Sequence, residues 1–174
     1  MKLYRARIPA IASTVVDKLV ADGDIEVEST DREEALRDLT AIMEMYVRRD
    51  NELREAVREK MDAENIPYDE FSRARSEVAS VMGQPLGHHV ETYLARQFTE
   101  NFMISRFVAE VFTEERMLFN KVKTLVKSFD VDENALRTEA EDRIKNIPRG
   151  SVEYQDAFQR ALKEVRKRHG LTDR

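Results

Sequence analysis

Thr30-Asp31-Arg32-Glu33-Glu34-Ala35-Leu36 aligns without a gap on Thr113-Glu114-Glu115-Arg116-Met117-Leu118-Phe119, at an offset of 83 residues (113 − 30). The alignment continues at the same offset through a series of apolar positions. These are Leu39, Ile42, Met43 and Tyr46 in the first stretch, and Val122, Leu125, Val126 and Phe129 in the second. Their spacing of three and four residues is typical of one face of an amphipathic α-helix. The chain is therefore expected to contain the same helical unit twice.

The later parts of the two copies align at a longer offset. Phe71 aligns with Phe158 at an offset of 87 residues (158 − 71), and Gly83 aligns with Gly170 at the same offset. The second copy therefore contains about four additional residues.

The segment Gly83-Gln84-Pro85-Leu86-Gly87 separates the copies, because its glycines and proline favour turns. We predict an all-α fold of about eight helices, arranged as two tandem related subdomains and packed as one compact or slightly elongated unit. The predicted boundaries are residues 1–83 for the first subdomain, 84–88 for the linker and 89–174 for the second.

The composition favours a helical protein of the cytoplasm. Hydrophobic residues make up 41% of the chain and charged residues 36%, and the periodic apolar positions argue against disorder. The net charge of −5 gives no general attraction to nucleic acid or to an anionic membrane. Cysteine is absent, which excludes disulfides and thiolate sites. No stretch approaches the roughly 20 apolar residues of a membrane span, and no signal peptide is recognised.

The first half contains clear signals for helix ends. Pro9 suits the first turn of a helix and Gly23 its end, and residues 24–28 are expected to form a short extended link. Thr30 and Glu33 have the spacing of a capping box for the next helix. Asp50 is expected to interrupt that helix and to cap a new one.

The second half is predicted in the same way. A long apolar-rich helix is expected from Val90 to Phe112, followed by a helix that starts at Thr113. Asp132 and Ser151 are predicted as the N-caps of the last two helices.

Three stretches carry a resemblance to a known family. They are Arg7 to Val27, Thr30 to Met61 with its Arg-Arg-Asp-Asn-Glu-Leu-Arg-Glu-Ala-Val-Arg segment, and Pro148-Arg149-Gly150-Ser151-Val152-Glu153-Tyr154 leading into Lys163 to Leu171. Together they cover nearly the whole chain, and they resemble the uncharacterised bacterial family catalogued as domain of unknown function 507. The resemblance implies a helical bacterial protein and brings no catalytic residue, cofactor or partner with it.

The C-terminal helix contains a basic stripe. Its candidate nucleic-acid or anion contacts are Arg160, Lys163, Arg166 and Lys167. Cations near a helix C-terminus are also favoured by the helix dipole, which gives this stripe a structural explanation. A nucleic-acid-associated regulator is therefore one alternative function.

His88, His89 and Glu91 are candidate metal ligands, since imidazole and carboxylate groups bind zinc and iron. Adjacent helical residues point about 100° apart, so the two histidines cannot complete a site by themselves. The chain also lacks the Glu-x-x-His motif of helical di-iron proteins. No metal and no cofactor are predicted, and a helical metalloprotein is kept as a further alternative.

The helix predicted from Val90 contains more apolar residues than one buried face needs. We expect its phenylalanines near a core shared by the two copies, with any exposed ones marking a subunit or partner interface. The candidate interface residues are Phe98, Phe102, Phe107 and Phe112.

No nucleotide-binding loop and no nucleophile motif is present, and no catalytic residue is singled out. The predicted function is therefore a non-enzymatic protein–protein interaction, scaffolding or regulatory module. Its partner is another protein or a second copy of this chain in a homodimer.

Overall fold

The computed structural model describes residues 1–148 and 151–171, and it confirms the all-α fold. The elements are the 3₁₀-helix η1 (Arg5–Arg7), α1 (Ile8–Ala21), β1 (Ile25–Glu26), α2 (Arg32–Glu64), the 3₁₀-helix η2 (Tyr68–Glu70), α3 (Phe71–Met82), α4 (His89–Ile104), β2 (Glu110–Val111), α5 (Glu115–Lys127), α6 (Glu133–Arg143) and α7 (Val152–Arg168). The described residues thus contain seven α-helices against the eight or so expected, because α2 stands where two helices were predicted.

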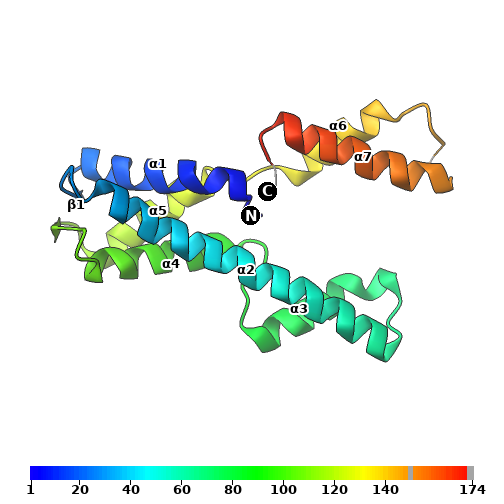
Figure 1. Ribbon diagram of the computed structural model, residues 1–174, viewed down its shortest axis with the longest axis horizontal. Coiled ribbons are helices and arrows are strands. Elements are labelled where there is room, and N and C mark those ends of the chain that lie inside the picture. The colour runs from blue at the N-terminus through cyan, green and yellow to red at the C-terminus, as the bar shows by residue number, and fades with distance from the viewer. Residues whose placement is uncertain (149–150, 172–174) are drawn as a thin grey trace.

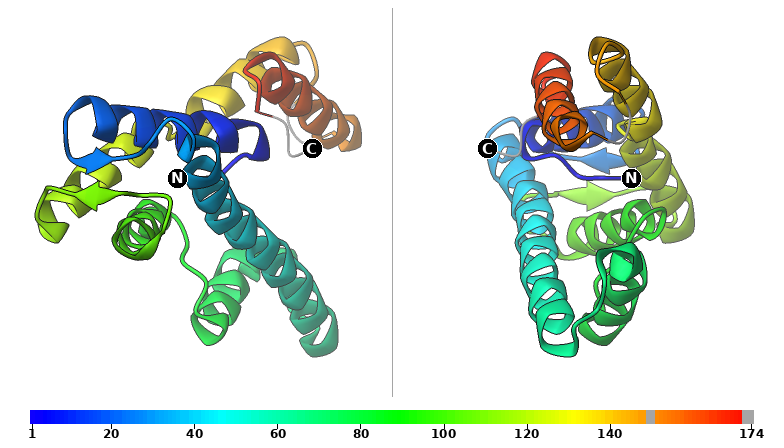
Figure 2. Two further views of the ribbon diagram at one scale, coloured as in Figure 1. Left: turned by 60° about the vertical axis from the view of Figure 1, so that its left-hand side comes forward. Right: turned by 90° about the vertical axis from the view of Figure 1, so that its right-hand side faces the viewer.

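The molecule consists of a central body and two arms (Figure 1). The body contains α1, α4, α5 and the N-terminal half of α2. The α2–α3 arm, residues 50–82, is the second half of α2 with α3 folded back against it. The α6–α7 arm is formed by the described residues of 132–171. Both arms leave the same side of the body and diverge from each other (Figures 1 and 2).

Each part has an apolar core of its own. The central core is the largest and contains Leu39, Phe98 and Val122, none of which is exposed. The buried residues of the α2–α3 arm are Leu53, Val57, Ala74 and Ala79. The buried residues of the α6–α7 arm are Leu136, Ala140, Leu162, Val165 and Leu171, and Tyr4 joins them from the N-terminal segment.

The central core is shared by the two halves of the sequence, since α1 and α2 pack with α4 and α5. In both halves a helix is followed by a short strand and then by further helices. The internal repeat and the division at residues 84–88 stay predictions.

The predicted break at Asp50 is wrong, because α2 runs without interruption through this position. Asp50 lies inside the helix, with only 9% of its surface exposed. Its carboxylate accepts hydrogen bonds from Arg54, one turn later in α2, and from Arg75 in α3. A carboxylate bound by two guanidinium groups has no need of free backbone amides, so it does not act as a cap.

The predicted capping box is also not formed. Asp31 occupies the N-cap position of α2, and no side chain accepts a hydrogen bond there. The Asp31 and Arg32 amides both donate to the carbonyl of Glu28, at 3.0 and 3.1 Å. A backbone turn thus satisfies two amide groups, and Arg32 is free to pair with Asp17 of α1 at 2.7 Å.

The long helix predicted from Val90 to Phe112 ends earlier, at Ile104. Ser105 is extended, and its hydroxyl donates to Asp38 of α2 at 2.8 Å and accepts from the Phe107 amide at 3.3 Å. The chain then forms β2, which pairs antiparallel with β1. The extended link predicted at residues 24–28 is therefore confirmed in β1, whereas its partner strand was mistaken for helix.

Asp24 fixes the β1–β2 pair to α5. Its carboxylate accepts hydrogen bonds from Thr113 at 2.8 Å and from Lys121 at 2.5 Å. Lys121 also pairs with Asp22 at 2.6 Å. The hydrogen bond from Lys121, followed by that from Lys18, lowers the pKa of Asp22. A two-residue ladder is weak alone, so these side chains hold it in place.

The helix predicted to start at Thr113 begins two residues later, at Glu115. Three other predicted helix ends are confirmed. Pro9 lies in the first turn of α1. Asp132 accepts from the amides of Asn134 and Ala135, and Ser151 accepts from the Tyr154 amide. These caps satisfy amides that have no partner within the helix.

Candidate binding cleft between the two arms

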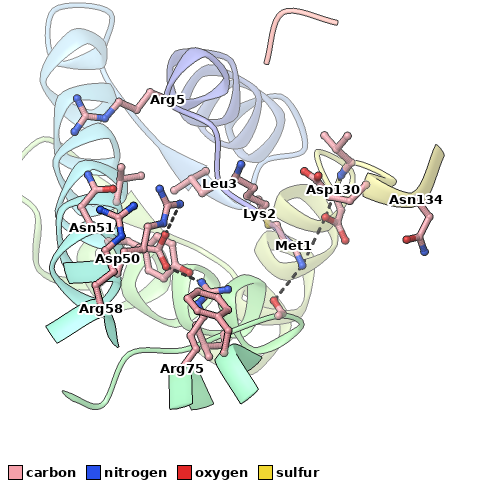
Figure 3. Close-up of a pocket in the computed structure, with 18 of the residues that line it drawn as sticks. Met1, Lys2, Leu3, Arg5, Asp50, Asn51, Arg58, Arg75, Asp130 and Asn134 are labelled. Atoms are coloured by element: carbon pink, nitrogen blue, oxygen red, sulfur yellow. Dashed lines mark hydrogen bonds and ion pairs between the residues drawn. The ribbon is translucent and has the colours of Figure 1, made fainter. Parts of the chain in front are cut away.

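An open cleft of about 1590 Å³ lies where the two arms diverge (Figure 3). Its apolar lining is Met1, Leu3, Tyr46, Val47, Met61, Ile66, Tyr68, Phe71, Leu86 and Val131. Its charged lining is Lys2, Arg5, Asp50, Arg54, Arg58, Asp62, Arg75, Asp130, Asp132 and Glu133. The cleft therefore combines an apolar surface with charges of both signs.

The α2–α3 arm forms a basic wall of the cleft. Arg54 donates to Asp50 at 2.8 Å and Arg75 donates to the other oxygen of Asp50 at 3.0 Å. Arg58 lies one turn beyond Arg54, is exposed, and has no ion-pair partner among the described residues. Two arginines thus share one carboxylate, while a third carries a free positive charge.

Hydrogen bonds at the base of this arm connect residues 82–85 to α2. The Tyr46 hydroxyl donates to the Pro85 carbonyl at 3.1 Å, and the Gln84 amide donates to the Tyr46 carbonyl at 3.3 Å. Arg49 donates to the Met82 carbonyl at 2.8 Å. Burial, assisted by the negative charge of Asp50, raises the pKa of Tyr46, so its hydroxyl keeps its proton.

The segment that leads into α6, residues 130–134, forms an acidic wall. Asp130 and Asn134 lie across the cleft from Arg58 and Arg75 in Figure 3. Between Asp130 and Asn134 come two further acids. They are Asp132, the cap of α6, and Glu133.

Glu133 also joins the α6–α7 arm to the rest of the molecule. It accepts hydrogen bonds from the Tyr4 hydroxyl and from Arg166, the latter at 2.7 Å. Burial opposes ionisation of Glu133, but these two hydrogen bonds outweigh it and lower its pKa. Tyr4 itself is 1% exposed, and the ammonium of Lys2 lies 4.4 Å from its ring centroid.

The N-terminal residue lies at the fork of the two arms. The Met1 amino group donates to the Gly87 carbonyl at 3.0 Å and lies 3.6 Å from a carboxylate oxygen of Asp130. It therefore connects the segment before α4 with the start of the α6–α7 arm.

The predicted basic stripe lies on α7 and does not line the cleft. Arg160, Lys163 and Lys167 are exposed, as an anion-binding surface requires. Arg166 is partly buried and pairs with Glu133. The structure thus assigns Arg166 a role in joining α7 to α6, and it leaves three exposed cations.

The four candidate interface phenylalanines have different environments. Phe98 and Phe102 are 0% and 2% exposed in the central core, so neither offers surface to a partner. Phe98 and Phe102 lie in the core shared by the two halves, as expected, but the prediction that they form an interface is wrong. Phe107 is partly buried, with the Arg106 guanidinium 4.8 Å from its ring centroid, and Phe112 is 58% exposed. Self-association through Phe112 stays a prediction.

His88 and His89 are exposed at the start of α4, with ring centroids 3.9 Å apart. In the described part of the chain, no group of three or more histidine, aspartate or glutamate side chains has the arrangement of a metal site.

The basic wall was not recognised in the sequence. One signal for it was present, because Asp50, Arg54 and Arg58 follow one another at intervals of four residues. This spacing places them on one helix face. Arg75 is distant in sequence, and only the folding of α3 against α2 brings it to the same carboxylate.

The family described as Protein of unknown function (DUF507) matches residues 1–171, and the chain belongs to this family. No curated protein matches the chain. Among the described residues, no helix is sufficiently long and apolar to cross a membrane.

Proposed function

We propose that this DUF507 chain is a non-enzymatic interaction module, which binds a segment of another protein in the cleft between its arms. The observation that carries the proposal is the lining of the cleft. Binding surfaces for proteins combine an apolar centre with charged groups at the edge. The lining of the cleft combines the same two kinds of group, since apolar residues such as Phe71 and Leu86 line it together with the basic wall and the acidic wall.

The size of the cleft agrees with a short polypeptide. An α-helix about 11 Å across that rises 1.5 Å per residue occupies about 140 Å³ per residue. The 1590 Å³ of the cleft is therefore of the same order as the volume of a few helical turns. Since the cleft is open to solvent, such a segment can enter it.

The proposal is tested by capture of partners from a native extract after nuclease treatment, with matched variants of the full chain. Tyr68 and Val81 are both highly exposed in the α2–α3 arm, at 83% and 89%, but only Tyr68 lines the cleft. A partner bound in the cleft should be lost with Tyr68→Glu and retained with Val81→Glu. Equal capture by both variants would contradict the proposal.

A second candidate function is binding of nucleic acid by α7. It is supported by the exposure of Arg160, Lys163 and Lys167, which have no ion-pair partner in the described part of the chain. The double variant Lys163→Glu/Lys167→Glu should then abolish binding of labelled RNA or DNA, measured by fluorescence anisotropy. If the double variant gives the same anisotropy titration as wild type, nucleic-acid binding by α7 is ruled out. This result would not bear on the proposal that the cleft binds a protein segment.

A further inference from the structure

We propose that Arg54, Arg58 and Arg75 bind carboxylates of the occupant, which is an amphipathic α-helix with two acidic residues four positions apart. This inference rests on the proposed function, because it specifies the class of segment that the cleft takes. It follows from the unused hydrogen-bond donors, the spacing of the arginines and the charge of the opposite wall.

The basic wall has more donors and more charge than its own carboxylate can satisfy. Each guanidinium has five N–H groups, and Arg54 and Arg75 each direct one nitrogen to Asp50. With Arg58 and Asp62 included, this wall has three positive charges and two negative charges. The wall is therefore suited to an additional oxyanion.

The spacing of Arg54 and Arg58 indicates how that oxyanion is presented. Like charges four residues apart destabilise a helix, so an external acid between or beside them relieves an unfavourable arrangement. The two residues are separated by about 6 Å along the axis of α2. Two acidic residues four positions apart on a second helix have the same separation, so each can pair with one arginine.

The opposite wall favours a protein helix over a nucleic acid. Asp130 and Glu133 are paired with the Met1 amino group and with Arg166, and Asp132 adds a further negative charge, so that side of the cleft offers a continuous phosphate chain less attraction than the basic wall does. A helix can place acidic residues towards Arg58 and neutral or basic residues towards Asp130. Its remaining face would contact the apolar lining.

Selection from a displayed library of amphipathic helices of about 16 residues tests this inference. In each library helix, the positions beside the apolar face are varied among Glu, Lys, Gln and Ala. The full chain is the target of the selection. Wild type should enrich Glu at two positions four apart, whereas Arg58→Glu should enrich Lys at one of them. Arg48→Glu is the matched control, since Arg48 is exposed on the same helix and does not line the cleft.

Individual selected peptides should bind about tenfold more weakly to Arg58→Glu than to wild type, with affinities that fall as salt rises. Arg48→Glu should leave their affinity unchanged. Circular dichroism of both variants shows that the helices are intact.

Three results would overturn the inference, and they separate it from the proposed function. If the selected peptides depend on Tyr68 but show no preference for acidic residues, the proposed carboxylate site is wrong, whereas the proposal that the cleft binds a protein segment stands. Binders insensitive to Tyr68→Glu, or no binders, would count against both proposals. Displacement of the peptides by a single-stranded oligonucleotide, with loss of its binding in Arg58→Glu, would assign the wall to phosphate.

Discussion

The two arms are both antiparallel helical hairpins, but they are attached to the body in different ways. The α2–α3 arm continues a helix that begins in the body, so its direction is set by unbroken backbone hydrogen bonds. The α6–α7 arm follows a non-helical segment, residues 128–132, and its helices pack chiefly against each other. Its connection to the body depends on Tyr4 and Glu133. A hairpin can therefore be positioned by the backbone or by a few side chains, and the two kinds of attachment should respond differently to mutation.

The largest effect is expected from breaking the backbone connection of the α2–α3 arm. Asn51→Pro removes the amide hydrogen bond to Val47 and introduces a clash with its carbonyl, at a cost of about 3 kcal/mol or more. Asn51 is exposed, so loss of its side chain has little consequence, and Asn51→Ala is the control. Urea unfolding should show the loss for Asn51→Pro alone. Equal stabilities of the two variants would show that α2 does not determine how this arm is held.

A similar but local effect is expected from removing the side chain that attaches the α6–α7 arm. Tyr4→Ala deletes a buried aromatic ring and its hydrogen bond to Glu133, which should cost about 3 kcal/mol. Hydrogen exchange in α6 and α7 should then accelerate by about 100-fold, while α1 and α4 keep their protection. Tyr68→Ala, at an 83% exposed ring of the other arm, should change little. Uniform loss of protection throughout the molecule would argue that the arm is not a separate unit.

A smaller effect is expected at the basic wall. Asp50→Ala leaves Arg54 and Arg75 without their shared carboxylate, and both guanidiniums keep contact with solvent. The cost should be about 1–2 kcal/mol, below that of a fully buried pair. Denaturant titration measures it, with Asp62→Ala as the exposed control in the same cleft. If Asp50→Ala proves as stable as this control, Asp50 does not hold α3 against α2.

The smallest effect concerns the pH dependence of the α6–α7 arm. Because the pKa of Glu133 is lowered from its ordinary 4.5, ionised Glu133 stabilises the fold above that value. This contribution is lost as pH falls below 4.5 and through the lowered folded pKa. Glu133→Gln should therefore reduce stability by less than about 1 kcal/mol at pH 7, and the difference in Tm should shrink towards pH 3. A difference in Tm that is constant over this range would rule out ionisation as its cause.

The sequence predicted the helices well where the signals are local. Apolar periodicity identified the fold class, and Asp132 and Ser151 were correctly recognised as caps. The prediction that Asp50 caps a new helix is wrong. An aspartate in a polar stretch between two apolar runs is typical of an N-cap, so the local sequence favoured that interpretation. The actual partner of Asp50, Arg75, lies 25 residues away.

The end of α4 and the cleft were missed for the same reason. Ser105 leaves the helix where Asp38 of α2 accepts its hydroxyl, which periodicity within α4 does not reveal. The cleft joins residues from the N-terminal segment, α2, α3 and the start of α6. Contacts over such distances depend on the packing of whole helices, and no local pattern specifies them.

Because α2 is continuous, a change in its direction within the central body also moves the α2–α3 arm. The 33 residues of α2 span about 50 Å, and about 22 Å of that length lies beyond Asp50, in the arm. Tilting this rod by 10° would move its far end by about 4 Å, which is comparable to half the spacing between packed helices. A change in packing around Leu39 or Met43 in the central core would therefore alter the width of the cleft without any contact at the cleft itself. Conversely, an occupant that pushes the two arms apart would tilt α2. Since α2 is one rigid helix, this tilt would change the packing of its N-terminal half in the central core.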